Sequence, residues 1–281
     1  MTKVKHGVAL ALVATLVRSL DAAPCVADGE RVAFLGDSIT QFGAWPAGYV
    51  NLVRKGLDIA GVRIDCVYAG ISGHKSNDML KRLDRDVLAR RPKWMTLSCG
   101  VNDVWHGAKG VPLEDYKKNI SAILDKCAAS NVTVVVMTAT MIKEDAKNAE
   151  NTKLAAYNDW LRAEAKRRGL RLADQNAFMQ ETLSKIRETD KTPGNKLTKD
   201  GVHMDFRGNC MMAECLLKTL GVDERTMPAI REAWRHERGA AVAYLPLTQA
   251  EFEFIDADEG TFDEALQRRF IKMIEAEMKN R

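Results

Sequence analysis

Residues 31–40 read RVAFLGDSIT, a short apolar run that ends in a glycine, an aspartate and a serine. An apolar run of this length favours a buried strand of a parallel sheet. In an open parallel sheet, the residues that directly follow a strand line the crevice at its carboxyl edge, where ligands bind. The stretch therefore predicts a strand from Arg31 to Leu35, with Ser38 facing that crevice.

The same serine also has a purely structural interpretation. The spacing Ser38-x-x-Gln41 is that of a helix capping box, which requires no catalytic role. Ser38 by itself is therefore an open candidate for a nucleophile.

Short β-branched runs alternate with longer amphipathic segments through the middle of the chain. Further strands are expected at residues 63–68, 94–99, 132–137 and 171–173. The helices expected between them carry apolar residues at helical spacing, as in 79–88, 116–127 and 154–165. This alternation predicts an α/β fold in which right-handed βαβ units build a parallel sheet covered by helices on both faces.

The pattern changes after Gly221. Two helices are expected there, at residues 223–237 and 261–280, joined by an irregular stretch that contains Pro246. A separate domain of about 60 residues would have only a marginal core. We therefore expect a main domain at residues 24–221 and a helical extension at 222–281 that packs on it.

Residues 1–23 differ from the rest of the chain. A basic start is followed by an apolar run at residues 7–17 and by small residues before Pro24. This is the layout of a secretory signal peptide, and the run is too short to span a bilayer. It predicts a secreted or periplasmic protein, with a frayed N-terminal helix as the alternative. No later stretch is long enough to cross a membrane.

Composition and cysteine usage narrow the function. The chain has 281 residues, and its 46% of hydrophobic residues is typical of a globular protein. Its net charge of +4 is too small to predict a nucleic-acid partner. None of the six cysteines forms a C-x-x-C pair. Buried free thiols are the favoured interpretation, and the spacing leaves any disulfide pairing open.

Three more segments carry residue types suited to chemistry. The amide of Asn102, after the third strand, can donate to a developing oxyanion, and Gly70, after the second, can bring a backbone N–H close to a ligand. Asp200-Gly-Val-His203 has the spacing at which a carboxylate can orient an imidazole. Each of these segments is also a plausible ordinary turn.

The combination is more informative than each part. If the strands have the common order 2-1-3-4-5, the carboxyl ends of three neighbouring strands bring Gly70, Ser38 and Asn102 side by side at the topological switch point. His203 and its carboxylate partner would then complete a set of nucleophile, base and orienting group.

At these residues the sequence resembles the SGNH (GDSL-type) hydrolase family, whose four sequence blocks are matched in order between residues 31 and 221. The resemblance implies a flavodoxin-like, three-layer α/β/α fold with a five-stranded sheet, and ester hydrolysis without a metal or other cofactor. It implies that Ser38 is the nucleophile, that His203 is the general base and acid, and that Asp200 orients His203. The Ser38 and Gly70 N–H groups and the Asn102 side chain would form the oxyanion hole.

Several alternatives remain. Ser72, in GISGH at residues 70–74, misses the G-x-S-x-G pattern because His74 replaces the second glycine. A metal-dependent phosphoesterase would use Asp37, Asp103, Asp200 and His203, but one histidine is few for such a site. A non-catalytic binding module is disfavoured by the intact set. A dinucleotide enzyme is disfavoured because no G-x-G-x-x-G follows the first strand.

The residues around the expected site bear on the substrate. The candidates for its rim are Trp45, Tyr49, His74, Trp105 and His106. Their rings suit stacking on a sugar, or they could close the core beneath the loops. We expect an esterase for small acyl groups, acetyl above all, on a small-molecule or carbohydrate ester. A lipid-directed acylhydrolase such as a lysophospholipase is the alternative.

Overall fold

The computed structural model describes residues 23–243, which include a five-stranded parallel sheet of order β2-β1-β3-β4-β5. The strands are β1 (Arg31–Gly36), β2 (Asp65–Gly70), β3 (Trp94–Ser98), β4 (Thr133–Met137) and β5 (Arg171–Ala173). Their order confirms the predicted topology. Because β1 lies between β2 and β3, the carboxyl ends of these three strands are neighbours.

The second strand begins and ends two residues later than expected. Arg63 pairs with the turn before β1, since its N–H donates to Asp28 Oδ1 at 2.8 Å and its carbonyl accepts from Gly29 N at 2.7 Å. The ladder with β1 starts at Asp65 and runs to Gly70. Gly70 is therefore the last residue of the strand rather than part of the following loop.

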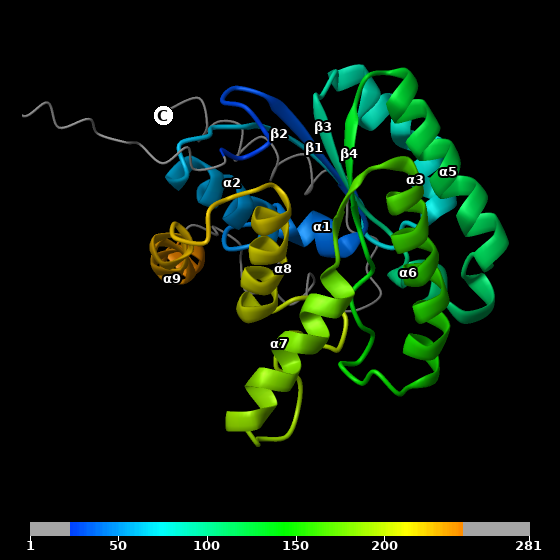
Figure 1. Cartoon of the computed structure of the whole chain (residues 1–281). Coiled ribbons are helices and arrows are strands. Elements are labelled where there is room, and N and C mark those ends of the chain that lie inside the picture. The colour runs from blue at the N-terminus through cyan, green and yellow to red at the C-terminus, as the bar shows by residue number, and fades with distance from the viewer. Residues whose placement is uncertain (1–22, 244–281) are drawn as a thin grey trace, which may run out of the picture.

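Helices cover both faces of the sheet, as predicted (Figure 1). The helices are α1 (Ser38–Gly43), α2 (Tyr49–Ile59), α3 (Ser76–Asp86), α4 (Val101–Trp105), α5 (Leu113–Ala129), α6 (Ala149–Arg168), α7 (Gln175–Thr189), α8 (Phe206–Thr219) and α9 (Met227–Ala243). Helices α3, α5 and α6 lie on one face, and α2 and α8 lie on the other, with α9 outside them. The result is the expected three-layer α/β/α arrangement.

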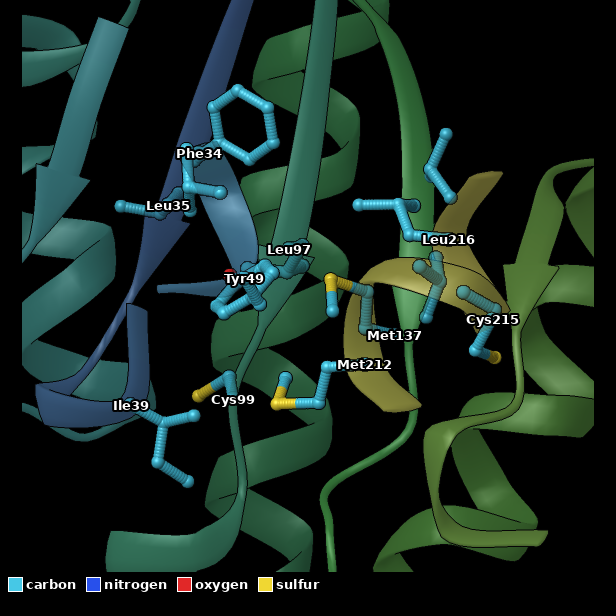
Figure 2. Packing of buried hydrophobic residues seen from close by; sticks show 14 of the residues in the cluster. Phe34, Leu35, Ile39, Tyr49, Leu97, Cys99, Met137, Met212, Cys215 and Leu216 are labelled. Carbon is cyan, nitrogen blue, oxygen red and sulfur yellow. The ribbon is translucent and has the colours of Figure 1, made fainter. Parts of the chain in front are cut away.

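The core fills the space between the sheet and its helices (Figure 2). Phe34 and Leu97 extend from the central strands, and Leu216 of α8 packs on the same cluster. All three side chains are almost fully buried. Burial of a side chain of this size contributes about 1.5–3 kcal/mol, so the sheet edge that follows β1 and β3 rests on a well-packed base.

Helix α9 is the described part of the expected C-terminal extension, and it packs on the main domain. Trp234 is buried and donates from Nε1 to the Leu52 carbonyl of α2 at 3.0 Å. The helix begins at Met227, not at residue 223 as predicted. Pro228 explains the start, because the first turn of a helix tolerates a residue without an N–H. The predicted helix at 261–280 and the predicted signal peptide fall largely outside the described residues.

The described chain starts against the end of α8. Cys25 N donates to the Leu220 carbonyl at 2.8 Å, and Val26 is fully buried. All six cysteines are free thiols, of which Cys25 and Cys210 are partly exposed and the other four are buried. Between residues 23 and 243, no helix combines the length and the apolar character that a membrane crossing needs.

Candidate active site

The turn from β1 into α1 presents Ser38 at the carboxyl edge of the sheet. A Cβ atom on Gly36 would lie 2.0 Å from Thr40 Oγ1, so only glycine allows the first turn of α1 to pack this closely on the strand. Asp37 is the N-cap of α1, and its Oδ1 accepts from Ile39 N at 3.0 Å. Ser38 is the first residue of the helix and is largely buried.

This geometry rejects the capping-box interpretation of Ser38. Asp37, not Ser38, caps the helix. Gln41 does not reach back to the cap; its Oε1 accepts from Ser72 N at 2.6 Å and so ties α1 to the loop after β2. The Ser38 hydroxyl is therefore available for a partner from another part of the chain.

That partner is His203. The distance from Ser38 Oγ to His203 Nε2 is 2.9 Å, although the residues are 165 positions apart. On the other side of the ring, His203 Nδ1 lies 2.5 Å from Asp200 Oδ2. The structure thus joins a hydroxyl, an imidazole and a carboxylate in one line of hydrogen bonds, with the spacing that nucleophile activation requires.

The Asp200 carboxylate is held in its ionised form. Its Oδ1 accepts from the backbone N–H of Val202 at 2.9 Å and of His203 at 2.7 Å. Partial burial raises the pKa of Asp200, but the hydrogen bonds from the His203 ring and these two backbone groups outweigh it and lower the pKa below its usual value. A carboxylate that stays charged fixes the tautomer of the ring, with the proton on Nδ1 and the Nε2 lone pair toward Ser38.

Asn102 is the second residue of α4 and follows β3 at the same edge. Its Nδ2 donates to the His74 carbonyl at 3.2 Å, and its Oδ1 lies 3.2 Å from His106 Nε2. The side chain is almost fully buried. These two contacts fix which end of the carboxamide is the donor and direct it toward the loop after β2.

Gly70 and Gly73 differ in their backbone surroundings. A Cβ on Gly70 would lie 2.2 Å from Gln41 N, so Gly70 is needed for close packing of α1. The Ile71 N–H donates to the Gly36 carbonyl of β1 at 3.1 Å. Because successive N–H groups of a strand point to opposite neighbours, the Gly70 N–H points away from β1. Gly73 is exposed and has a φ of 73°, in the left-handed region.

Ser72 is placed differently from Ser38. Its N–H is held by Gln41, and its Oγ is buried without a hydrogen-bond partner among the described residues. The arrangement needed to activate a hydroxyl is present at Ser38 and not at Ser72.

The structure divides the five candidate rim residues. Trp105 lies at the site, because its ring centroid is 6.5 Å from that of His203. Trp45 contacts Phe42 in a tilted arrangement with the ring centroids 4.7 Å apart, and the Phe42 ring is itself 5.2 Å from His203. His106 is exposed and contacts Asn102, as described above. Tyr49 is not a rim residue.

The reason is that Tyr49 is fully buried at the start of α2. Its hydroxyl bonds to Thr40 Oγ1 at 2.9 Å beneath α1. Burial raises the pKa of this phenol, which therefore stays neutral and structural. The sequence prediction for Tyr49 was wrong because the link between α1 and α2 turns its ring inward.

His74 is half-buried and is oriented by a residue that the sequence analysis missed. Arg82 of α3 is buried, donates from Nε to His74 Nδ1 at 3.0 Å and from Nη2 to the Gly36 carbonyl at 2.8 Å, and pairs with Asp86. Burial and the nearby Arg82 charge lower the pKa of His74, so its ring is neutral and carries its proton on Nε2. The spacing of apolar residues in 79–88 gave no sign that Arg82 would point inward.

The acids proposed for a metal site have other partners. Asp103 is buried, and its carboxylate accepts from Ser76 Oγ at 2.6 Å and from Ser76 N at 3.0 Å. Asp37 caps α1, and Asp200 bonds to His203. Among residues 23–243, no three His, Cys, Asp or Glu side chains are grouped as ligands for one ion.

Burial of acidic groups marks the edge that follows β1 and β3. Desolvation raises the pKa of Asp37 to about 6, with a smaller contribution from the neighbouring Asp103 charge. Desolvation also raises the pKa of Asp103, despite its bonds to Ser76. Acids with shifted pKa values in one place are typical of a functional site. Here Asp37 caps α1 and Asp103 holds Ser76, so both carboxylates have structural roles.

Comparison with known proteins identifies the family. Residues 34–209 match the model of the GDSL-like Lipase/Acylhydrolase family. An acetylxylan esterase from Geobacillus stearothermophilus is 25% identical over 220 residues, which cover 70% of this chain and 97% of that protein.

Solved structures give the same result. The crystal structure of an acetyl xylan esterase, AlAXEase, matches with a TM-score of 0.62 and 30% identity, over 67% of this chain and 98% of that one. Axe2, an acetylxylan esterase from Geobacillus stearothermophilus, matches with a TM-score of 0.63 and 25% identity, over 70% of this chain and 97% of that one. The part of the chain that these proteins cover includes a complete esterase fold.

Proposed function

The chain belongs to the GDSL-like lipase/acylhydrolase family and is a carboxylic ester hydrolase, and on that premise we propose that it is a serine esterase that removes acetyl groups from carbohydrates. The observation that carries the proposal is the line of contacts from Asp200 through His203 to Ser38. These contacts join α1 to a loop that lies 165 residues later in the sequence.

The proposed reaction begins at Ser38. Its Oγ attacks the ester carbonyl carbon while His203 Nε2 takes the hydroxyl proton, and Asp200 stabilises the imidazolium that forms. His203 then gives the proton to the leaving alkoxide, which departs as an alcohol. Water, activated by the same imidazole, hydrolyses the acyl-enzyme and releases the acid.

Backbone and side-chain donors would stabilise the tetrahedral oxyanion. The Ser38 N–H, at the first position of α1, has no partner within that helix. The Asn102 Nδ2 donates one proton to the His74 carbonyl, which leaves its second proton for the oxyanion. For the third donor we propose Gly73 in place of the predicted Gly70. Gly73 is exposed in the loop that contacts both Gln41 and Asn102, whereas the Gly70 N–H faces away from β1.

The choice of acetyl and carbohydrate rests on two observations. The relatives described above are named acetylxylan esterases. In addition, the rings of Trp105 and Phe42 lie near His203, and the Trp45 ring contacts Phe42. Flat aromatic surfaces beside a reactive serine suit the apolar face of a sugar ring.

Hydrolysis of p-nitrophenyl esters and of acetylated xylo-oligosaccharides tests the proposal. Ser38→Ala is expected to abolish turnover, whereas Ser72→Ala, its matched control, retains it. A fluorophosphonate should label Ser38. Activity that survives in Ser38→Ala, or a label on Ser72, would overturn the assignment. A chain-length series from acetate to decanoate that peaks at long acyl groups would favour a lipid substrate instead.

We further propose that the chain is exported, on the strength of its first 23 residues. Expression of the whole sequence in a bacterial host, followed by N-terminal sequencing of the periplasmic protein, tests this. A mature chain that begins near Pro24 supports export, and an intact Met1 in the cytoplasm contradicts it.

A further inference from the structure

We propose that Glu144 is a positioning residue of this active site, whose buried carboxylate holds the loop at residues 196–205 so that Asp200 and His203 face Ser38. Glu144 lies outside all four sequence blocks of the family and touches none of the reacting groups. The inference rests on the proposed function, because it gives Glu144 a role through His203.

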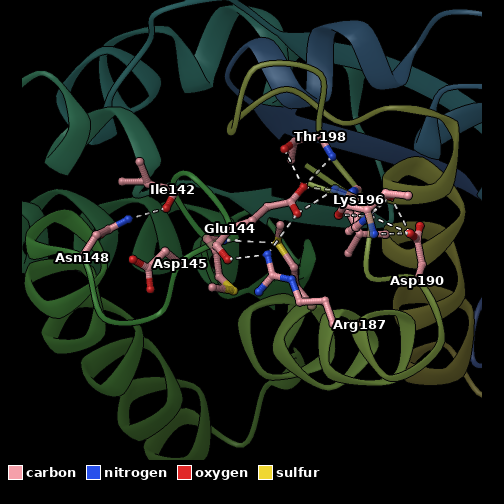
Figure 3. A network of polar contacts seen from close by, with 12 residues as sticks. Ile142, Glu144, Asp145, Asn148, Arg187, Asp190, Lys196 and Thr198 are labelled. Atoms are coloured by element: carbon pink, nitrogen blue, oxygen red, sulfur yellow. Dashed lines mark hydrogen bonds and ion pairs between the residues drawn. The ribbon is translucent and has the colours of Figure 1, made fainter. Parts of the chain in front are cut away.

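The Glu144 carboxylate is the centre of a polar cluster (Figure 3). It accepts from three consecutive backbone N–H groups: Lys196 at 2.8 Å, Leu197 at 2.9 Å and Thr198 at 2.8 Å. The Thr198 hydroxyl donates at 2.6 Å to Oε1, the oxygen that also accepts from the N–H groups of Leu197 and Thr198. The side chain is only 1% exposed. A single carboxylate thus satisfies four buried donors of one short segment.

These donors stand at the base of the loop that carries the catalytic histidine. Thr198 forms an antiparallel bridge with Met204, and Asp205 N donates to the Leu197 carbonyl at 2.9 Å. Inside that bridge, Lys199 N donates to the His203 carbonyl at 2.8 Å. Displacement of residues 196–198 would therefore displace His203 directly.

A second contact holds the tip of the loop. The Lys143 N–H donates to the Gly201 carbonyl at 2.7 Å, and a Cβ on Gly201 would lie 3.0 Å from Lys143 Cα. Gly201 lies between Asp200 and His203 in the sequence. Lys143 and Glu144 together contact both the base and the tip of the loop.

The backbone of this anchor is itself unusual. Lys143 and Glu144 have φ values of 60° and 47°, so two successive non-glycine residues adopt the left-handed conformation. That conformation is uncommon and persists when surrounding contacts enforce it. Arg187 of α7 helps, because its Nη2 donates to the Glu144 carbonyl at 3.0 Å and lies 3.6 Å from the carboxylate.

The chemistry of the cluster requires a carboxylate. Both of its oxygens accept, one from Lys196 N and the other from Leu197 and Thr198. A glutamine of the same shape offers one accepting oxygen and one NH₂ group, which cannot accept. Glu144→Gln therefore removes at least one bond to the loop while it preserves volume.

The experiment compares Glu144→Gln, Thr198→Val and the double variant in the full chain, with Glu164→Gln as the matched control. Glu164 is a similarly buried carboxylate, but it pairs with Arg167 and Arg168 at the far end of α6. For p-nitrophenyl acetate we expect kcat to fall roughly tenfold in Glu144→Gln and about threefold in Thr198→Val, with KM unchanged, since small misplacements of a catalytic group cost up to about a hundredfold.

Three results decide the proposal. A double variant no slower than Glu144→Gln supports a single shared anchor, whereas fully additive losses contradict it. Wild-type kcat in Glu144→Gln, or in Thr198→Val should Glu144→Gln fail to fold, overturns the role. A loss of the same size in Glu164→Gln also overturns it, because that loss would report stability alone. The proposed esterase mechanism is judged separately, by whether Ser38→Ala is inactive.

Discussion

The two sides of the candidate site are held by different means. Ser38 and Asn102 follow β1 and β3, so the central strands of the sheet and their buried side chains fix both residues. Asp200 and His203 follow no strand of the sheet. They lie on a loop whose position depends on hydrogen bonds to Lys143 and Glu144.

The two sides should therefore respond differently to amino-acid substitutions. The sheet edge has regular backbone pairing and a packed core beneath it, and single polar substitutions there leave most of that support in place. The loop has one antiparallel bridge and one buried carboxylate. We therefore expect substitutions on the loop side to act through the orientation of His203, and substitutions at the sheet edge to act at the substituted group alone.

Among the variants that compare the loop with the sheet edge, Asp200→Asn should have the largest effect. The Asn oxygen can still accept from the backbone of Val202 and His203, so the loop keeps its conformation while the ring loses its carboxylate partner. We expect kcat to fall by about 10⁴-fold, as for a triad histidine in the wrong tautomer.

Asp205→Asn is the control for that variant, because it changes a carboxylate of the same loop that caps α8 through Gly208 N. An amide can serve this cap equally well. Equal losses in the two variants, measured with p-nitrophenyl acetate, would mean that loop integrity and not the Asp200–His203 pair governs the rate.

Asn102→Ala examines the sheet edge and should have the next largest effect. Removal of one oxyanion donor costs about 2.7–4 kcal/mol of transition-state stabilisation, so kcat should fall by roughly 10²–10³-fold with little change in KM. The control is Asn119→Ala, which removes a partly buried amide that bonds to Ser76 Oγ at 3.0 Å. An Asn102→Ala enzyme with wild-type kcat would exclude this residue from the oxyanion hole.

Asp37→Asn tests the cost of the buried carboxylate beneath Ser38, through stability. Burial raises the pKa of Asp37 from 3.8 to about 6, so between these pH values the folded state keeps a proton that the unfolded state releases. The free energy of unfolding therefore falls as pH rises through this window. Asparagine keeps the helix cap and does not titrate.

The expected difference between Asp37→Asn and wild type grows from pH 4 to pH 6 and then levels off at roughly 3 kcal/mol in favour of the variant. Urea unfolding at a series of pH values measures it. For Glu164→Gln we expect the variant to be less stable than wild type, with a difference that grows between pH 2 and pH 4.5. The reason is that the hydrogen bond from Arg167 lowers the pKa of Glu164 from 4.5 to about 2. A pH-independent difference for Asp37→Asn would mean that Asp37 does not titrate in this range.

The fold and the contact between Asp200 and His203 could be predicted because they depend on patterns that are local in sequence. Each strand was marked by an apolar run, and the alternation of strands and helices indicated a parallel sheet. The strand order was assumed to be the common one for such a sheet, and the structure has that order. Asp200 and His203 are three residues apart, so their contact needed only a turn. The convergence of Ser38 and His203 followed from the resemblance of the four blocks to one family.

The remaining features depend on directions that the spacing does not specify. Tyr49 was expected at the rim because it precedes a helix near the active edge, yet the preceding link turns it into the core. Arg82 lies on a helix with a clear apolar stripe, but its long side chain passes under the sheet edge to Gly36. Glu144 stands in an irregular segment, and no pattern indicates that its backbone is left-handed.

The contact between Cys25 and Leu220 places the start of the described chain before β1, at the amino end of the sheet, whereas Ser38 lies at the opposite edge. A polymer bead coupled ahead of Ala23 would therefore leave Ser38 facing the bulk liquid. Under the proposed function, a form immobilised in this way is expected to accept bulky, insoluble glycans, whereas attachment through the exposed Lys199 beside Asp200 is expected to block them.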